Sequence, residues 1–347
     1  MPTPFGNEGS EGSEGSEGSE GSEGSEGSEG SAINNSGISA YSGRRASTLL
    51  VQALATTQAE ITRGISNISK GDLKQHTLQW DAGLARWSPE VRARLYNFQL
   101  VSSLHFDSRS DDVARLWKRK GSLSPVSSGV RTAKYDLLAE LRRPAYDYNK
   151  VGSPAPSSAP GYPLKLADEL AKVFAKVPLR TDRRAEILAQ VAVPHAFFAA
   201  VLNLQPGRRR RTFELMAAAA SFASVMGQQF KQHFRVLRPA DRSTLIQPMV
   251  LTPAHGAYPA GHAIQGHLIR GVLVDLLGLV STDEAYGQLE RLADRISDNR
   301  LVAGVHYEPD LTQGKALAAD LCTYFLAQTQ APESPLRWLW DRAKREK

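Results

Sequence analysis

Apolar residues recur at intervals of three and four positions through most of the sequence, and this spacing restricts the chain to few folds. The interval matches the 3.6-residue turn of an α-helix, so each stretch would present one apolar face for burial. Alternation of apolar and polar residues, the pattern of a half-buried strand, is nearly absent. We therefore predict an all-α protein made of one or more helical bundles. The stretches with helical spacing are 44–68, 88–104, 165–177, 183–204, 212–237, 261–280, 282–307 and 314–329.

Two stretches of unusual composition divide the chain. The triplet Glu-Gly-Ser repeats from Glu8 to Ser31 and offers no side chain for a core, so residues 1–31 are predicted to be a disordered acidic tail. A segment rich in proline, glycine and serine, residues 151–163, is predicted to be a linker. We expect an N-terminal helical layer over residues 32–150 and a C-terminal helical catalytic region over residues 164–347.

Composition narrows the classes of partner and location. The net charge of +6 favours an anionic ligand, and the single cysteine, Cys322, excludes an internal disulfide. No apolar run reaches the roughly 18 residues of a membrane span, so no membrane partner is expected. No basic region followed by an apolar core is visible at the N-terminus, which favours a cytoplasmic location. The arginine run 208–211 lacks interleaved aromatic residues, so we interpret it as a basic face and expect no nucleic acid.

Lys231 and Arg238 form the first element with chemical meaning. They stand seven residues apart, two helical turns, just before Pro239, which is predicted to stop the helix. Both side chains would then project from one helical face. Such a pair alone is also typical of a solvated surface.

The second element is the stretch HGAYPAGH, which begins at His255. Pro259 suits the first position of a helix, Gly261 lets the backbone approach a ligand, and His262 would lie in the first turn. The free N–H groups of a helix start attract an anion. A Pro-Gly turn with a buried core histidine is the structural alternative.

The third element, NRLVAGVHYEPD, contains Arg300, Gly304, His306 and Asp310. Their spacing predicts that Arg300 and Gly304 share a helical face, with Asp310 one turn beyond His306, unless Pro309 interrupts the helix. Asp310 would accept a proton from His306 and fix its tautomer, which leaves the other nitrogen to act as a nucleophile or a metal ligand. A surface arginine and a helix-end histidine are the alternative.

The order of the three elements resembles the superfamily that unites vanadium-dependent haloperoxidases with type 2 phosphatidic acid phosphatases and soluble acid phosphatases. The resemblance covers residues 231–310 by motif, and it places an oxyanion site at the core of the C-terminal bundle. It implies that three cations hold the equatorial oxygens of a tetrahedral oxyanion, since arginine and lysine both suit such a ligand. These cations are Lys231, Arg238 and Arg300.

The resemblance also implies roles for the remaining residues. Gly261 would give a backbone N–H to the anion, and His262 would be the acid–base histidine. His306 would bind vanadium in haloperoxidases or attack phosphorus in phosphatases. Two departures from the family pattern are Ala260 and Asn299, both at positions where the family usually has serine. Loss of one hydroxyl donor at Ala260 would cost about 1–3 kcal/mol if nothing replaces it, which weakens vanadate binding.

Residues around the anion cage favour the haloperoxidase branch. The position of His255 carries histidine in algal bromoperoxidases, where it would position the halide or tune protonation, although it would equally cap the next helix. The resemblance then implies a vanadate cofactor, with hydrogen peroxide and a halide, bromide or iodide rather than chloride, as substrates. An organic acceptor and a homo-oligomer are both compatible with this interpretation.

Two alternatives stay open. A soluble acid phosphatase of the same superfamily would act through a phosphohistidine at His306. A catalytically silent anion-binding protein, or a basic scaffold for nucleic acid, would need no paired histidines, and salt-dependent DNA binding without turnover would identify it.

Overall fold

The computed structural model describes residues 84–110, 112–119, 135–144, 166–192, 194–332 and 334–346. The predicted tail 1–31 and the predicted linker 151–163 lie outside the described residues. The fold is mainly helical, as predicted. Four long helices form its centre: α6 (Arg210–Phe234), α8 (Gly261–Leu277), α9 (Glu284–Val302) and α10 (Glu308–Gln330).

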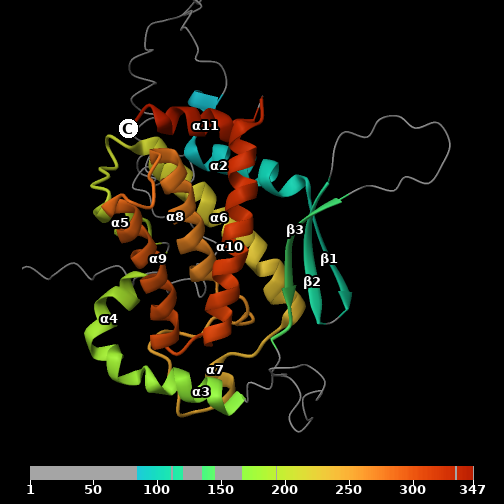
Figure 1. The fold of residues 1–347 in the computed structure, drawn as a ribbon, viewed down its shortest axis with the longest axis vertical. Helices are drawn as coiled ribbons and strands as arrows, with labels where there is room; N and C mark the ends of the chain where they lie inside the picture. Colours follow the sequence, from blue (N-terminus) through green and yellow to red (C-terminus); the bar gives the residue numbers. More distant parts are fainter. Residues whose placement is uncertain are drawn as a thin grey trace, which may run out of the picture.

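Helix α8 is the central element of this bundle, because it packs against α6, α9 and α10 (Figure 1). Small residues allow the close approaches. A Cβ at Gly227 of α6 would lie 3.0 Å from the Ile264 side chain, and one at Gly314 of α10 would lie 2.8 Å from the Ala260 carbonyl oxygen. A side chain at either glycine would therefore push a neighbouring helix away from the start of α8, where the second motif lies.

Shorter helices surround the bundle. Helix α11 (Pro335–Lys344) and α2 (Pro89–Ser102) cover one end (Figure 1). Ser88 caps α2, because its side chain accepts a hydrogen bond from the Val91 N–H at 3.4 Å. The remaining elements are η3 (Leu84–Arg86), α3 (Leu166–Ala175), η4 (Val177–Leu179), α4 (Arg180–Ala189), α5 (His195–Val201) and α7 (Pro239–Arg242).

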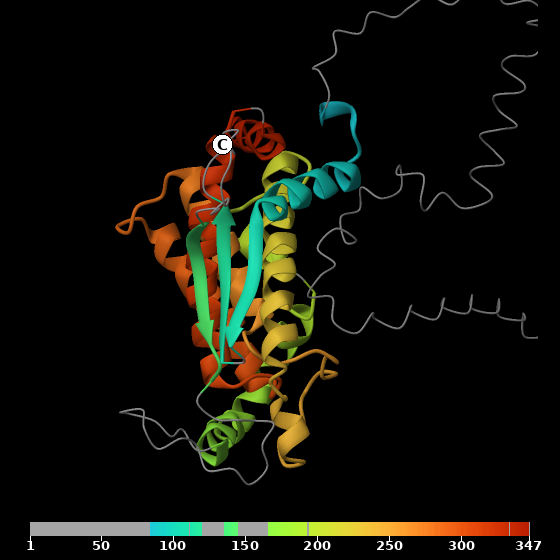
Figure 2. The same ribbon diagram turned by 90° about the vertical axis from the view of Figure 1, so that its right-hand side faces the viewer.

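A three-stranded antiparallel sheet departs from the prediction of helices alone. Its order is β1–β2–β3, formed by β1 (Leu104–Ser110), β2 (Val113–Arg119) and β3 (Tyr135–Arg142). The described part of the expected N-terminal helical layer, residues 32–150, thus holds strands as well as α2. Figure 2 shows the sheet lying along the bundle beside α10 and α6.

The sheet forms because its strands do alternate, over stretches too short to stand out beside the helices. Ala114 and Leu116 of β2 and Ala139 and Leu141 of β3 are buried, whereas charged neighbours such as Arg115 are only half-buried. These buried side chains form one apolar face of the sheet. This face packs against the apolar surface of the bundle, and its burial stabilises the sheet.

Proline also divides one expected helix. The stretch 183–204 was predicted as one element, but α4 ends at Ala189 and α5 begins at His195, directly after Pro194. Proline lacks an N–H and clashes with the preceding turn, so it favours a helix start. The break leaves the C-terminal carbonyl groups of α4 free of helical partners, and these carbonyls contact the candidate site described next.

Candidate functional site

Lys231 and Arg238 lie on different elements. Helix α6 ends at Phe234, Arg235 adopts a left-handed φ of 48°, and Arg238 is the N-cap residue of α7. The prediction that both cations share one helical face is therefore wrong, because the helix ends earlier and Pro239 begins α7 instead of stopping α6. Both side chains are nevertheless buried, with exposed fractions of 2% and 1%.

The two cations meet at the loop that precedes α8. Lys231 Nζ donates to the carbonyl oxygens of Gly256 at 3.0 Å and Ala257 at 3.2 Å. Arg238 Nε donates to the His255 carbonyl oxygen at 3.1 Å, and its Nη2 lies 3.5 Å from that of Gly256. A Cβ at Gly256 would lie 3.1 Å from the Lys231 carbonyl oxygen, so glycine permits this approach.

His255 contacts the guanidinium of Arg238 directly. Its Nδ1 lies 3.2 Å from Arg238 Nη2. The same Nδ1 also lies 3.2 Å from the Gly256 carbonyl oxygen. A guanidinium only donates and a carbonyl oxygen only accepts, so the protonation of Nδ1 decides which of the two contacts is a hydrogen bond. The structure therefore brings His255 to the same guanidinium as His306.

His306 lies in the connection between α9 and α10 and is 1% exposed. Its Nδ1 lies 3.2 Å from Oδ2 of Asp310, which also accepts the Tyr307 N–H at 3.0 Å. A guanidinium only donates, so Nε2 accepts from Arg238 Nη1 and the proton of the neutral ring lies on Nδ1, which faces Asp310. Arg238 Nη1 lies 3.4 Å from this Nε2 and donates to the Val305 carbonyl oxygen at 2.8 Å.

Asp310 is fully buried, and its surroundings act on it in opposite directions. Burial has the largest effect and raises the pKa of this carboxyl; the Tyr307 N–H and the positive charges of Lys231 and Arg238 offset only part of the rise. Both cations therefore act electrostatically on the carboxylate that orients His306.

The third motif differs from its predicted geometry. Helix α9 ends at Val302, and Gly304 has a φ of +79°, outside any helix. Arg300 and Gly304 therefore do not share a helical face. Pro309 lies in the first turn of α10, where it starts that helix instead of interrupting one.

His262 and Arg300 contact the end of α4. His262 is the second residue of α8, because the helix begins at Gly261 and not at Pro259 as predicted. Its Nε2 donates to the Gln190 carbonyl oxygen at 2.8 Å. Arg300 Nη2 donates to the Ile187 carbonyl oxygen at 3.2 Å. Both side chains are buried, with exposed fractions of 6% and 2%.

These contacts form two groups joined by the backbone of one residue. The first contains Arg238 with both His255 and His306, and the second contains His262 and Arg300 at α4. Val305 links them, since its N–H donates to the Arg300 carbonyl oxygen at 3.2 Å and its own carbonyl accepts from Arg238. The six cationic or imidazole side chains predicted for the site are therefore placed on a connected set of contacts.

The second group, His262 and Arg300 at α4, is held by two residues for which the sequence predicted no role. Gln190 and Asn299 are fully buried, and Asn299 Nδ2 donates to Gln190 Oε1 at 2.9 Å. Arg183 Nη1 lies 3.3 Å from the Asn299 Oδ1. Asn299 thus fixes the residue whose carbonyl binds His262, and its departure from the family's serine was the signal that could have found this pair.

Arg180 is a further residue that the sequence did not indicate. Its guanidinium donates to three carbonyl oxygens, those of Val302 at 2.9 Å, Gln247 at 2.7 Å and Ile246 at 2.9 Å. It therefore fastens the loop between the first and second motifs to the end of α9. Burial lowers the pKa of Arg180. Nothing in its sequence context distinguishes it from the neighbouring arginines.

Ala260 is fully buried at the N-cap of α8. Its N–H donates to the Asp310 carbonyl oxygen at 2.9 Å, which ties the second motif to the third. Its side chain brings no donor to the helix start. The N–H groups of the first turn of α8, including that of Gly261, belong to the set that has no partner within the helix.

The burial of charge indicates what such a site can bind. Lys231, Arg238 and Arg300 are buried cations, whereas Asp310 and Glu169 are the buried carboxylates found near them among the described residues. Burying a cation is costly unless an opposite charge offsets it. An oxyanion with several acceptor oxygens would supply that charge, so the residues present fit a tetrahedral oxyanion.

Comparisons with known proteins give little information about what this site binds or which reaction it catalyses. No protein-family model matches the chain, and no curated protein matches it. Two solved structures are similar over about half of the chain, each at 19% sequence identity with a TM-score of 0.38. One is a transmembrane PAP2 type phosphatidylglycerolphosphate phosphatase from Bacillus subtilis, of which the chain covers 87%. The other is a bacterial vanadium-dependent iodoperoxidase, of which it covers 51%.

Neither likeness assigns an activity at this level of similarity. In the part of the chain that the structure describes, no helix is long and apolar enough to cross a membrane. Within the same residues, no group of three or more His, Cys, Asp and Glu side chains is arranged to hold a metal ion.

Proposed function

We propose that this chain is an enzyme of the superfamily shared by vanadium-dependent haloperoxidases and PAP2 type phosphatases, and that it acts as a haloperoxidase. The observation that carries the proposal is the position of Arg238. Its buried guanidinium contacts Nε2 of His306 and Nδ1 of His255, at 3.4 Å and 3.2 Å. A cation between two imidazoles, beside a buried lysine, suits an oxyanion that binds at His306.

Each residue of the proposed site would have a distinct task. Lys231, Arg238 and Arg300 would hold the oxygens of vanadate, together with the N–H of Gly261. Nε2 of His306 would bind the vanadium, because Asp310 holds the proton on Nδ1. When bound, vanadate would supply the Lewis acid that activates hydrogen peroxide for halide oxidation.

His262 would move protons at the site. Its Nε2 is engaged by the Gln190 carbonyl, which can only accept, so Nδ1 is the nitrogen that gains and loses a proton. General acid–base catalysis of this kind needs a fixed tautomer and a fixed ring orientation, and the buried Gln190 supplies both.

His255 supports the haloperoxidase over the phosphatase. A phosphatase needs a nucleophile and an acid, which His306 and His262 would already supply. A third imidazole on the same arginine has no task in that reaction. In a haloperoxidase it would help to place a halide, preferably bromide or iodide, beside the oxyanion.

The second candidate is a soluble phosphatase acting through a phosphohistidine at His306. Two observations favour it: the His306–Asp310 pair also suits a nucleophile, and Ala260 lacks the hydroxyl that would help to hold vanadate. Phosphate would meet the same cations.

One paired assay tests both candidates. The protein is loaded with vanadate and tested for bromide-dependent halogenation of a dye with hydrogen peroxide, and separately, without vanadate, for hydrolysis of a phosphate monoester. We expect halogenation that falls at least about 100-fold in His306→Ala. Arg291→Ala, at an exposed position of α9, serves as the control and should keep full activity. If the protein hydrolyses the ester but does not halogenate the dye, the phosphatase replaces the haloperoxidase as the proposed function. If it shows neither activity, both proposals are refuted.

A further inference from the structure

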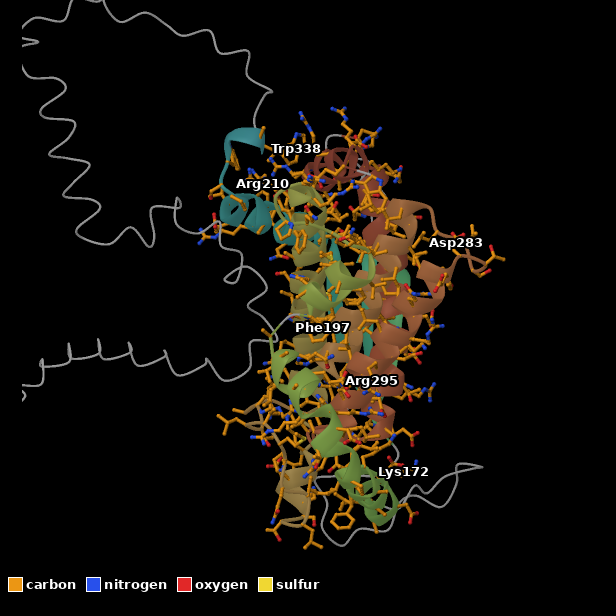
Figure 3. All side chains as sticks on the ribbon, turned by 90° about the vertical axis from the view of Figure 1, so that its left-hand side faces the viewer. Lys172, Phe197, Arg210, Asp283, Arg295 and Trp338 are labelled. Atoms are coloured by element: carbon orange, nitrogen blue, oxygen red, sulfur yellow. The ribbon has the colours of Figure 1, made fainter. Side chains whose placement is uncertain are left out.

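An arginine-rich surface lies at the end of the molecule where α6 begins and α11 ends. We call it the basic end face and define it by Arg208, Arg209, Arg210, Arg342, Lys344 and Arg345, all exposed or half-buried. Figure 3 labels Arg210 of α6 and Trp338 of α11 at this same end. Helix α10, roughly 35 Å long, separates it from His306, so the basic end face is distinct from the proposed catalytic site.

Hydrogen bonds and arginine–tryptophan contacts join the two parts of the basic end face. Glu346 accepts hydrogen bonds from the N–H groups of Arg211 and Thr212 at 2.8 and 2.9 Å, which fixes the C-terminal segment to the start of α6. The guanidinium carbons of Arg211 and Arg342 lie 5.0 and 5.7 Å from the ring centre of Trp338. Trp338 is thus the apolar platform on which arginines from both helices gather.

Three carboxylates at this end, those of Glu214, Glu346 and Asp341, already have partners among the described residues. Glu214 accepts hydrogen bonds from Arg92 and from Arg211, and Glu346 is held by the start of α6. Asp341 lies 3.8 Å from Arg337. The basic end face therefore keeps a positive potential that attracts an acidic partner.

The first described residues of the chain lie at this same end. Arg92 Nη1 donates to the carbonyl oxygen of Leu84 at 3.1 Å and also contacts that of Trp87. The guanidinium carbon of Arg92 lies 5.5 Å from the ring centre of Trp338. Leu84, the first described residue, therefore lies beside the basic end face.

We propose that the Glu-Gly-Ser repeat, residues 8–31, docks on the basic end face of its own chain. The repeat places one glutamate at every third position from Glu8 to Glu29 and contains no cation. Residues 32–83, which connect it to Leu84, can span at most about 180 Å, so the connection does not prevent the contact. A tethered acidic segment is also present at a high effective concentration, which favours binding within one chain over binding of free polyanions.

Carbodiimide cross-linking of the full chain at low ionic strength tests the proposal. The reagent condenses a glutamate carboxylate with a nearby lysine amine, and Lys344 is the lysine of the basic end face. We expect amide bonds between the repeat and Lys344, found by mass spectrometry in the monomer band. They should fall at least about tenfold in 1 M salt, where charges are screened within about 3 Å.

Matched variants define the outcome. Arg208→Gln with Arg210→Gln should reduce the Lys344 cross-link at least about fivefold, whereas Arg184→Gln with Arg291→Gln removes the same charge elsewhere and should not. Cross-links spread equally over exposed lysines, or found only in a dimer band, would overturn the proposal.

A second measurement tests whether nucleic acid is the partner instead. A fluorescent 20-nucleotide oligodeoxythymidylate is titrated into the wild type and into a variant with every repeat glutamate changed to glutamine. A docked repeat should lower the affinity of the wild type at least about tenfold relative to the variant. That difference should disappear in Arg208→Gln with Arg210→Gln. Equal, tight binding to wild type and variant would show that the basic end face serves nucleic acid and would refute docking of the repeat.

Discussion

The carbonyl oxygen of Gln190 lies 2.8 Å from Nε2 of His262, and the side chain of Gln190 is in turn held by Asn299 at 2.9 Å. A chain of two hydrogen bonds thus runs from α9 through the end of α4 to the proposed acid–base histidine. All three residues are buried, so solvent does not replace a lost partner at low cost.

Asn299→Ala should therefore slow catalysis without abolishing anion binding. We expect kcat to fall about tenfold, because supporting residues of this kind are worth about 10–100-fold. KM for hydrogen peroxide should change little, and the pH profile of kcat should shift, because the tautomer and orientation of His262 are less fixed. Steady-state kinetics across pH, with ¹⁵N NMR of the His262 ring, measure both effects.

Ser297→Ala is the matched control for this change. Ser297 is buried on the same helix, but its hydroxyl donates to the Ala293 carbonyl within α9 and not to α4. The control should keep the pH profile of the wild type. If Asn299→Ala alters only the free energy of unfolding and leaves the pH profile unchanged, Asn299 has a structural role alone.

Apolar spacing predicted the long helices α6, α8, α9 and α10 well, because it is a local property. The predicted helical stretch 44–68 lies outside the described residues. The prediction was wrong at helix ends that depend on the conformation of single residues or on contacts between distant segments. The end of α6 at Phe234 depends on the left-handed Arg235, and a non-glycine residue in this conformation leaves no sign in the sequence. Gly304, by contrast, has the positive φ that is typical of a glycine after a helix end, a local signal that the prediction of a face shared by Arg300 and Gly304 overlooked.

The residues that support the site were harder to predict than its cations. Arg180 donates to carbonyl groups of distant segments, and the backbone carbonyl of Gln190 accepts from the distant His262; no spacing along the chain records such contacts. The three strands were missed for a related reason: their alternation extends over seven or eight residues and is confirmed only by burial against the bundle. Motif residues are visible in sequence, whereas their partners become visible only in the fold.

Ala260→Ser should tighten vanadate binding. The change adds a hydroxyl donor at the N-cap of α8, beside the Gly261 N–H. A hydrogen bond to a charged group contributes about 1.5–3 kcal/mol, so we expect an affinity increase of about tenfold or more. Titration of apo-protein with vanadate by calorimetry measures it. Ala263→Ser, one turn further along α8, is the control. An unchanged affinity in both variants would mean that the anion does not bind at the start of α8.

The stability of the protein should depend on pH through His267. Burial lowers the pKa of His267 to about 4, although Asp294, at 3.5 Å, acts in the opposite direction. The unfolded chain, with a pKa near 6.5, therefore binds more protons between pH 4 and pH 6.5. The free energy of unfolding must then rise with pH through this window and fall as the solution is acidified.

His267→Gln should remove this part of the pH dependence, which amounts to roughly 3 kcal/mol across the window. Urea denaturation of wild type and variant at pH 4.5, 5.5, 6.5 and 7.5 gives both slopes. The variant should show the shallower slope. Parallel slopes would mean that His267 is protonated to the same extent in the folded and unfolded states.

Two glycines with positive φ provide a matched pair for testing how Arg180 positions the third motif. Gly304 has a φ of +79°, and a Cβ there would lie 2.7 Å from Arg180 Nη2, whereas Gly278 has a φ of +69° with no atom within 4 Å of such a Cβ. Gly278→Ala should cost only the strain of the left-handed backbone, about 1–2 kcal/mol. Gly304→Ala should cost about 1 kcal/mol or more beyond that and should also displace the Arg180 guanidinium from the carbonyls that it holds.

We therefore expect Gly304→Ala, but not Gly278→Ala, to lower activity at least about tenfold at a temperature where both variants are folded. Equal losses of stability with equal activity would show that the Arg180 contacts do not position Arg300 and His306 for catalysis.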